Sequence, residues 1–72
     1  MIWYDGVHLA SDVSLEELHE EAAKIGLKRN WLHNGKIPHY DVMGRFLKKI
    51  VKNCTSRELV LACRKVYENA DP

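Results

Sequence analysis

The chain has 72 residues, of which 46% are hydrophobic and 29% are charged, and its formal net charge is +1. This length predicts a single domain over residues 1–72 with a small core, and the composition excludes intrinsic disorder. The sequence contains neither the roughly 18–20 apolar residues of a membrane helix nor a signal-peptide pattern, so we expect a soluble cytoplasmic protein.

The first half of the chain predicts a strand followed by a helix. Residues 2–4 (IWY) combine β-branched and aromatic side chains, and Asp5-Gly6 then predicts a turn. Ser14 and Glu17 have the spacing of a capping box that opens a helix, and Gly26 ends it. The apolar residues between these limits repeat at helical spacing at Leu15, Leu18, Ala22 and Ile25.

The second half predicts two further strand–helix units. Residues 28–32 can form a second strand, and Asp41 can cap a second helix with Val42, Phe46, Leu47 and Ile50 on one face. Residues 51–54 form either a turn or a third strand. Thr55 and Glu58 form a second capping box. It opens a third helix whose expected inward residues are Leu59, Ala62, Cys63, Val66 and Tyr67.

This order of elements predicts an α/β fold of two or three layers, βαβαβα, with a short, mainly parallel sheet. The small core makes a homo-oligomer plausible, because subunit contact would bury further apolar surface. We expect Cys54 and Cys63 to be reduced core residues. Trp3 and Trp31 fall on the predicted strands and are expected in the core, although an aromatic edge at a site could stack on a base.

A ligand site is predicted where loops at the carboxyl ends of the strands converge. These loops contain Asp5, Gly6 and His8 after the first strand, residues 33–41 after the second, and Thr55 and Ser56 after the third. His8 and His39 can donate or accept hydrogen bonds there, Asp5 and Asp41 can bind a hydroxyl group or a metal, and Arg45 can face an anion. A structural interpretation stands beside this one, with Asp41 as a helix cap and the histidines as hydrogen-bonded structural residues.

Charge is separated along the chain. Residues 1–23 contain acidic side chains and no lysine or arginine, whereas residues 24–52 are basic apart from Asp41. This pattern indicates either two solvated faces or a positive surface that attracts an anionic ligand.

No phosphate-binding loop, nucleophile motif or recognised metal signature is present, so we assign no metal, cofactor or catalytic residue. One alternative is a metal-dependent phosphoesterase that uses His8, His39, Asp5 and Asp41. Another treats residues 42–69 as a helix-turn-helix that contacts DNA phosphates, which requires a turn at residues 51–55.

Three motifs resemble a bacterial and phage family of small uncharacterised domains. They are HLASDVSLEELHEEAAKIGLKRNWL, PHYDV and TSREL, within roughly residues 1–62. The family pattern falls on His8, Asp12, Glu17, His19, Arg29, Trp31, His39, Tyr40, Asp41, Arg57 and Glu58. The chain departs from it at Leu32, where an aromatic residue is common, and at Met43-Gly44.

The resemblance implies nucleotide or phosphate chemistry, because some relatives are joined to a phosphohydrolase-type domain. The length of the chain resembles that of phage-encoded versions, so we expect a phage-type protein in the host cytoplasm. It is expected to capture an anionic nucleotide-like molecule and to sequester a host immune signal. Nucleic acid and membranes are not expected partners. The predicted ligand-binding residues are Asp5, His8, Arg29, His39, Tyr40, Asp41 and Arg45.

Overall fold

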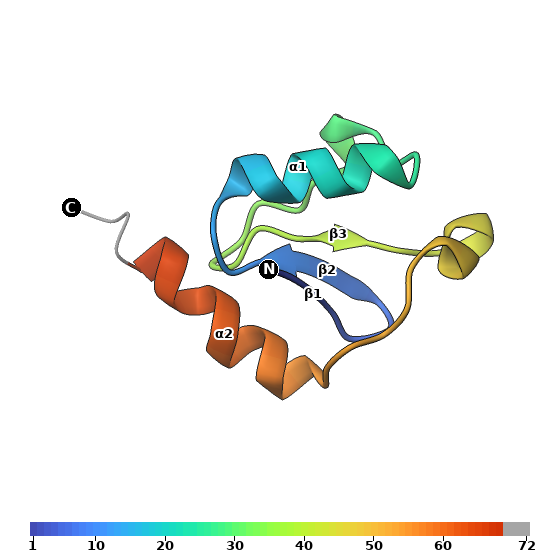
Figure 1. The fold of residues 1–72 in the computed structure, drawn as a ribbon. Coiled ribbons are helices and arrows are strands. Elements are labelled where there is room, and N and C mark those ends of the chain that lie inside the picture. Colours follow the sequence, from blue (N-terminus) through green and yellow to red (C-terminus); the bar gives the residue numbers. More distant parts are fainter. Residues whose placement is uncertain (69–72) are drawn as a thin grey trace.

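Three strands form an antiparallel sheet in the computed structural model, which describes residues 1–68. The strands β1 (Ile2–Tyr4), β2 (His8–Ser11) and β3 (Tyr40–Asp41) lie in the order β1-β2-β3 (Figure 1). The predicted mainly parallel βαβαβα fold is therefore wrong. The link between β1 and β2 is only residues 5–7, and so short a connection can join only antiparallel neighbours.

Two helices, α1 (Leu15–Lys24) and α2 (Ser56–Glu68), pack on opposite faces of this sheet (Figure 1). Successive strand residues point to opposite faces, which divides the core in two. The half on the α1 side contains Tyr4, Leu9, Leu18, Ala22, Leu27, Tyr40 and Val42. The half on the α2 side contains Ala10, Cys54, Leu59 and Cys63, with Trp3, Ile37 and Ala62 packed against them.

Both predicted N-cap residues are confirmed, but Glu17 does not complete a capping box with Ser14, because the Ser14 N–H donates to Ser11 Oγ instead. The Ser14 hydroxyl accepts a hydrogen bond from the backbone N–H of Glu17 at the start of α1, and Gly26 follows the helix with φ +95°. At α2, Thr55 Oγ1 accepts from the N–H of Glu58, whose carboxylate accepts from the N–H of Thr55. The side chains of Val66 and Tyr67 lie outside the described part of the chain.

The segments predicted as the second strand and second helix are both short 3-10 helices. Residues 28–32 contain η1 (Arg29–Trp31), and residues 42–50 contain η2 (Gly44–Lys49). Asp41 does not cap a helix, because it pairs with β2, and Met43 occupies the N-cap position of η2 without a side-chain hydrogen bond. Without an α-helix here, residues 42–68 lack the helix pair that a helix-turn-helix requires.

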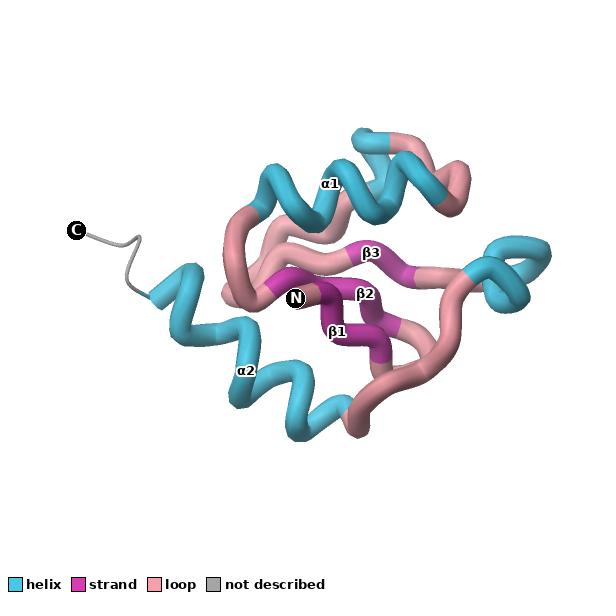
Figure 2. The backbone as a smooth tube through the Cα atoms, viewed as in Figure 1, coloured by secondary structure: helices cyan, strands magenta, loops and turns pink. Residues whose placement is uncertain are grey.

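Residues 51–54, the possible third strand, form a loop (Figure 2). This loop still runs beside β1, where Asn53 makes hydrogen bonds to the backbone of β1 that a neighbouring strand would otherwise make. Its backbone N–H donates to Tyr4 O, its side-chain Oδ1 accepts from Tyr4 N and its Nδ2 donates to Ile2 O. The Asn53 amide thus satisfies backbone groups at the outer edge of the sheet.

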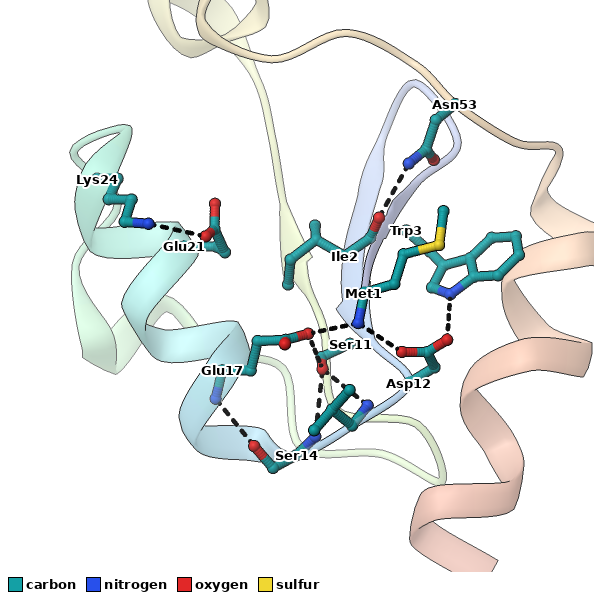
Figure 3. Close-up of polar contacts among 11 residues, drawn as sticks. Met1, Ile2, Trp3, Ser11, Asp12, Ser14, Glu17, Glu21, Lys24 and Asn53 are labelled. Atoms are coloured by element: carbon teal, nitrogen blue, oxygen red, sulfur yellow. Dashed lines mark hydrogen bonds and ion pairs between the residues drawn. The ribbon is translucent and has the colours of Figure 1, made fainter.

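The start of β1 is tied to α1 through polar contacts (Figure 3). The Met1 amino group lies 2.8 Å from Asp12 Oδ1 and 3.0 Å from Glu17 Oε1, and Trp3 Nε1 donates to Asp12. Ser11 donates to the Glu17 carboxylate. Within residues 1–68, neither helix has the length and apolar character to cross a membrane.

Candidate metal centre

Strand pairing brings His8, His39 and Asp41 together. His8 and Asp41 are partners across β2 and β3, so their side chains share one face of the sheet. His39 lies two residues before Asp41 and projects to the same side. It also pairs with His33 across the intervening turn, through N–H···O bonds of 2.8 and 3.1 Å. The centre lies on the sheet face that α2 covers.

Hydrogen bonds fix which nitrogen of each ring is free. Nδ1 of His8 lies 2.9 Å from Asp5 Oδ2, and Nδ1 of His39 lies 2.9 Å from the carbonyl oxygen of Ile37. Both partners can only accept, so each Nδ1 carries the proton. In each neutral ring, Nε2 therefore carries a lone pair that a metal ion can accept. The hydrogen bond at Nδ1 sets the orientation of the ring, as it does for histidine ligands in known metal sites.

The Asp41 carboxylate completes the cluster. Its buried Oδ1 has no hydrogen-bond partner among the described residues. His39 Nε2 lies 3.6 Å from this oxygen, which is too long for a hydrogen bond. Oδ2 lies 3.3 Å from Nε2 of His33, whose ring stacks on His39 at a centroid distance of 5.3 Å. A buried carboxylate oxygen without a donor is unfavourable unless a cation approaches it.

Asp5 contacts His8 of this cluster through the ring nitrogen that does not face the other two residues. Its carboxylate accepts from the backbone N–H groups of Val7 and His8, from His8 Nδ1 and from Ser56 Oγ. Burial alone would raise the pKa of Asp5, but these bonds outweigh burial and lower it. With its acceptor positions used, Asp5 orients His8 and is not free to bind a ligand. The Ser56 hydroxyl donates its hydrogen bond to Asp5 and not to His8. His8 is therefore not placed to act as a general base for Ser56.

The ligand atoms of His8, His39 and Asp41 lie within 4.8 Å of one another. Bonds of about 2.0–2.1 Å to a tetrahedral zinc ion would place them about 3.3 Å apart. Metal binding therefore requires a small inward movement, which these partly exposed side chains can make. Two imidazoles and one carboxylate suit zinc and other first-row divalent ions.

Two pockets are lined by residues of the cluster. One of about 380 Å³ includes His8, His39, Asp5 and Lys36, with Ser56 and other residues of α2. The other, of about 470 Å³, has a largely apolar lining. Its residues are Leu27, Asn30, Trp31, Leu32, His33, Asp41, Met43 and Phe46. Both volumes are in the range of small-molecule sites.

The remaining predicted ligand-binding residues lie elsewhere. Tyr40 is buried on the α1 side of the sheet, where its hydroxyl lies 2.6 Å from His19 Nδ1. Arg29 is an exposed residue of η1, and Arg45 lies over the Phe46 ring at 5.1 Å. Only Asp5, His8, His39 and Asp41 of the predicted set come together at the cluster.

The sequence placed His33 and Ser56 on the loops expected to converge at the site, but neither was among the predicted ligand-binding residues. Asn34-Gly35 predicts a tight turn that returns the chain from His33 toward His39. The contact of Ser56 with Asp5 depends on the packing of α2, which the spacing of residues in the sequence does not encode.

The fold and this site define a small domain, with an antiparallel sheet between two helices, that carries a histidine–carboxylate cluster suited to a divalent cation. The chain belongs to the family described as "Protein of unknown function (DUF4031)", which matches residues 2–66. Comparison with curated proteins found no match, and neither did comparison with solved structures.

Proposed function

We propose that the chain binds a divalent metal ion through His8, His39 and Asp41 and uses it to capture an anionic, nucleotide-like small molecule. The supporting observation is the buried Oδ1 of Asp41, which has no hydrogen-bond partner among the described residues, beside two imidazoles that use Nδ1 for their hydrogen bonds. When both histidines are neutral, the two Nε2 atoms and the Asp41 carboxylate present only acceptors to one another. A cation between them relieves this repulsion. This proposal replaces the sequence-based expectation of no metal.

The anion-binding half of the proposal rests on charge and space. A three-residue metal site leaves at least one coordination position for a further ligand. Lys36 lines the pocket beside His8 and His39 and supplies a second positive charge. A phosphate oxygen on the metal, with Lys36 nearby, would satisfy both groups. The resemblance to phage domains extends the proposal to sequestration of a host signal in the cytoplasm.

Metal-dependent phosphoester hydrolysis is a second candidate. It is favoured by the same open position, because a divalent ion held by His8, His39 and Asp41 would make water a better nucleophile near neutral pH. Incubation of the Zn²⁺- or Mn²⁺-loaded protein with bis(p-nitrophenyl) phosphate separates the two functions. Turnover that disappears in His39→Ala supports hydrolysis, whereas an unchanged substrate supports capture alone.

Metal binding is tested by calorimetric titration with Zn²⁺ and Mn²⁺, together with native mass spectrometry. We expect about one ion per chain for at least one metal, and at least a tenfold loss of affinity in His39→Ala and in Asp41→Asn. His19→Gln is the control, because His19 lies on α1 against Tyr40 and outside the cluster. No saturable binding by the wild-type protein, or equal binding by both cluster variants, contradicts the proposal.

A further inference from the structure

We infer that the pocket of Trp31 and Phe46 binds the planar base of the captured nucleotide, while its phosphate binds at the metal centre. The inference rests on the proposed function for the phosphate half alone. The base half depends on side chains outside the metal cluster, so each half can be tested by itself.

The pocket has an aromatic and apolar lining that suits a planar ring. Trp31 and Phe46 meet edge to face, with ring centroids 5.8 Å apart and planes at 68°, and form two walls of an aromatic corner. Trp31 is 41% exposed, although it was expected in the core. Leu27 and Leu32 add apolar surface, and the Asn30 amide can hydrogen-bond the edge of a base.

Positive charge around the aromatic corner favours an anionic aromatic molecule over an alkyl chain. Lys28 Nζ lies 5.8 Å from the centre of the Trp31 ring. Arg45 and Lys49 lie 5.1 and 6.0 Å from the centre of Phe46. An uncharged apolar ligand would gain nothing from these cations, whereas a phosphorylated one is attracted by them as it enters.

The pocket shares Asp41 with the metal centre. His33 and Asp41 line it, and the same carboxylate belongs to the His8–His39–Asp41 group. A ligand whose ring lies on Trp31 can therefore extend toward Asp41 at the metal centre. A nucleoside monophosphate carries both a base and a phosphate, so it is the ligand class that this arrangement suits.

The test compares adenosine 5′-monophosphate with ribose 5-phosphate by calorimetry on the Zn²⁺-loaded protein. Base stacking should make the nucleotide bind about tenfold more tightly or better. Trp31→Ala should abolish this ratio without changing the affinity for Zn²⁺ or for ribose 5-phosphate. Leu47→Ala, an exposed apolar residue of η2 outside the pocket lining, should retain the ratio. Equal affinities in the wild-type protein, or a ratio that persists in Trp31→Ala, overturn the inference.

A second experiment tests the base pocket without metal, so that it remains decisive if Zn²⁺ does not bind and the proposed metal function fails. The metal-free protein is titrated with adenosine while its amide NMR signals are followed. Saturable shifts within residues 27–33 and 43–46 that are lost in Trp31→Ala support the base pocket. Shifts confined to other residues, or no shifts at all, overturn it.

Discussion

Asp5 Oδ2 lies 2.9 Å from Nδ1 of His8, and this contact joins the turn after β1 to the face of β2 that carries the proposed metal site. The same oxygen accepts from Ser56 at 2.6 Å, so the first turn of α2 helps to hold the carboxylate in place. Asp5 is nearly inaccessible to solvent, whereas the His8 side chain is 43% exposed. The buried partner thus orients an exposed metal-ligand candidate.

Replacement of Asp5 should weaken metal binding without removing a metal ligand. Asp5→Asn loses the negative charge that orients His8, and we expect about a 10–100-fold loss of Zn²⁺ affinity by calorimetry. Ser56→Ala is the matched control, because it removes another donor to the same oxygen and leaves the His8 contact. Equal Zn²⁺ affinity in Asp5→Asn and the wild-type protein would show that Asp5 has only a structural role.

Acid should destabilise the fold partly through Asp5. Its folded-state pKa is lowered, so ionised Asp5 stabilises the protein above its unfolded pKa of about 3.9, and this contribution is lost as pH falls toward the folded pKa. Asp12 and Glu17 also have lowered pKa values and add to the loss. Urea unfolding between about pH 6 and pH 2 should therefore give a shallower decline for Asp5→Asn than for the wild-type protein. Parallel curves would contradict this role.

The Asn53 side chain should contribute measurably to stability. Asn53→Ala removes its hydrogen bonds with Tyr4 N and Ile2 O and leaves edge groups of β1 without protein partners. We expect the free energy of unfolding to fall by about 1–2 kcal/mol in urea denaturation. Val51→Ala, at a side chain that is 84% exposed in the same loop, should change it by less than about 0.5 kcal/mol. Similar losses in both variants would refute the edge-pairing role.

Both cysteines should be unreactive in the folded protein. Burial raises the pKa of the Cys63 thiol to about 12, and it also raises that of Cys54, so little thiolate forms at pH 8. Labelling with 5,5′-dithiobis(2-nitrobenzoic acid) at pH 8 should be slow in native buffer and should reach both thiols in urea. Rapid labelling of either thiol without denaturant would place it at the surface.

The first strand and the helix starts could be predicted because their determinants are local. A capping box places donor and acceptor three residues apart, and residues 2–4 are strand-forming wherever they pack. The prediction that Asp41 caps a helix was wrong because it used the same local pattern, whereas the structure at Asp41 depends on a distant contact. Its spacing suits a helix cap, but pairing with His8 places it in β3, and Gly44 with φ +59° begins only a short 3-10 helix.

The sequence by itself determined the residue types of the candidate site, the helix α1 and the capping box of α2. Tertiary structure alone decided that the sheet is antiparallel, that Asp5 supports His8 and that Tyr40 faces the opposite side from His39. Strand direction and register arise from contacts between residues far apart in the chain, such as His8 with Asp41, which local propensity does not encode. A shift of one residue in that register would turn Asp41 toward α1 and separate it from the histidines, so the metal centre depends on the pairing of β2 with β3.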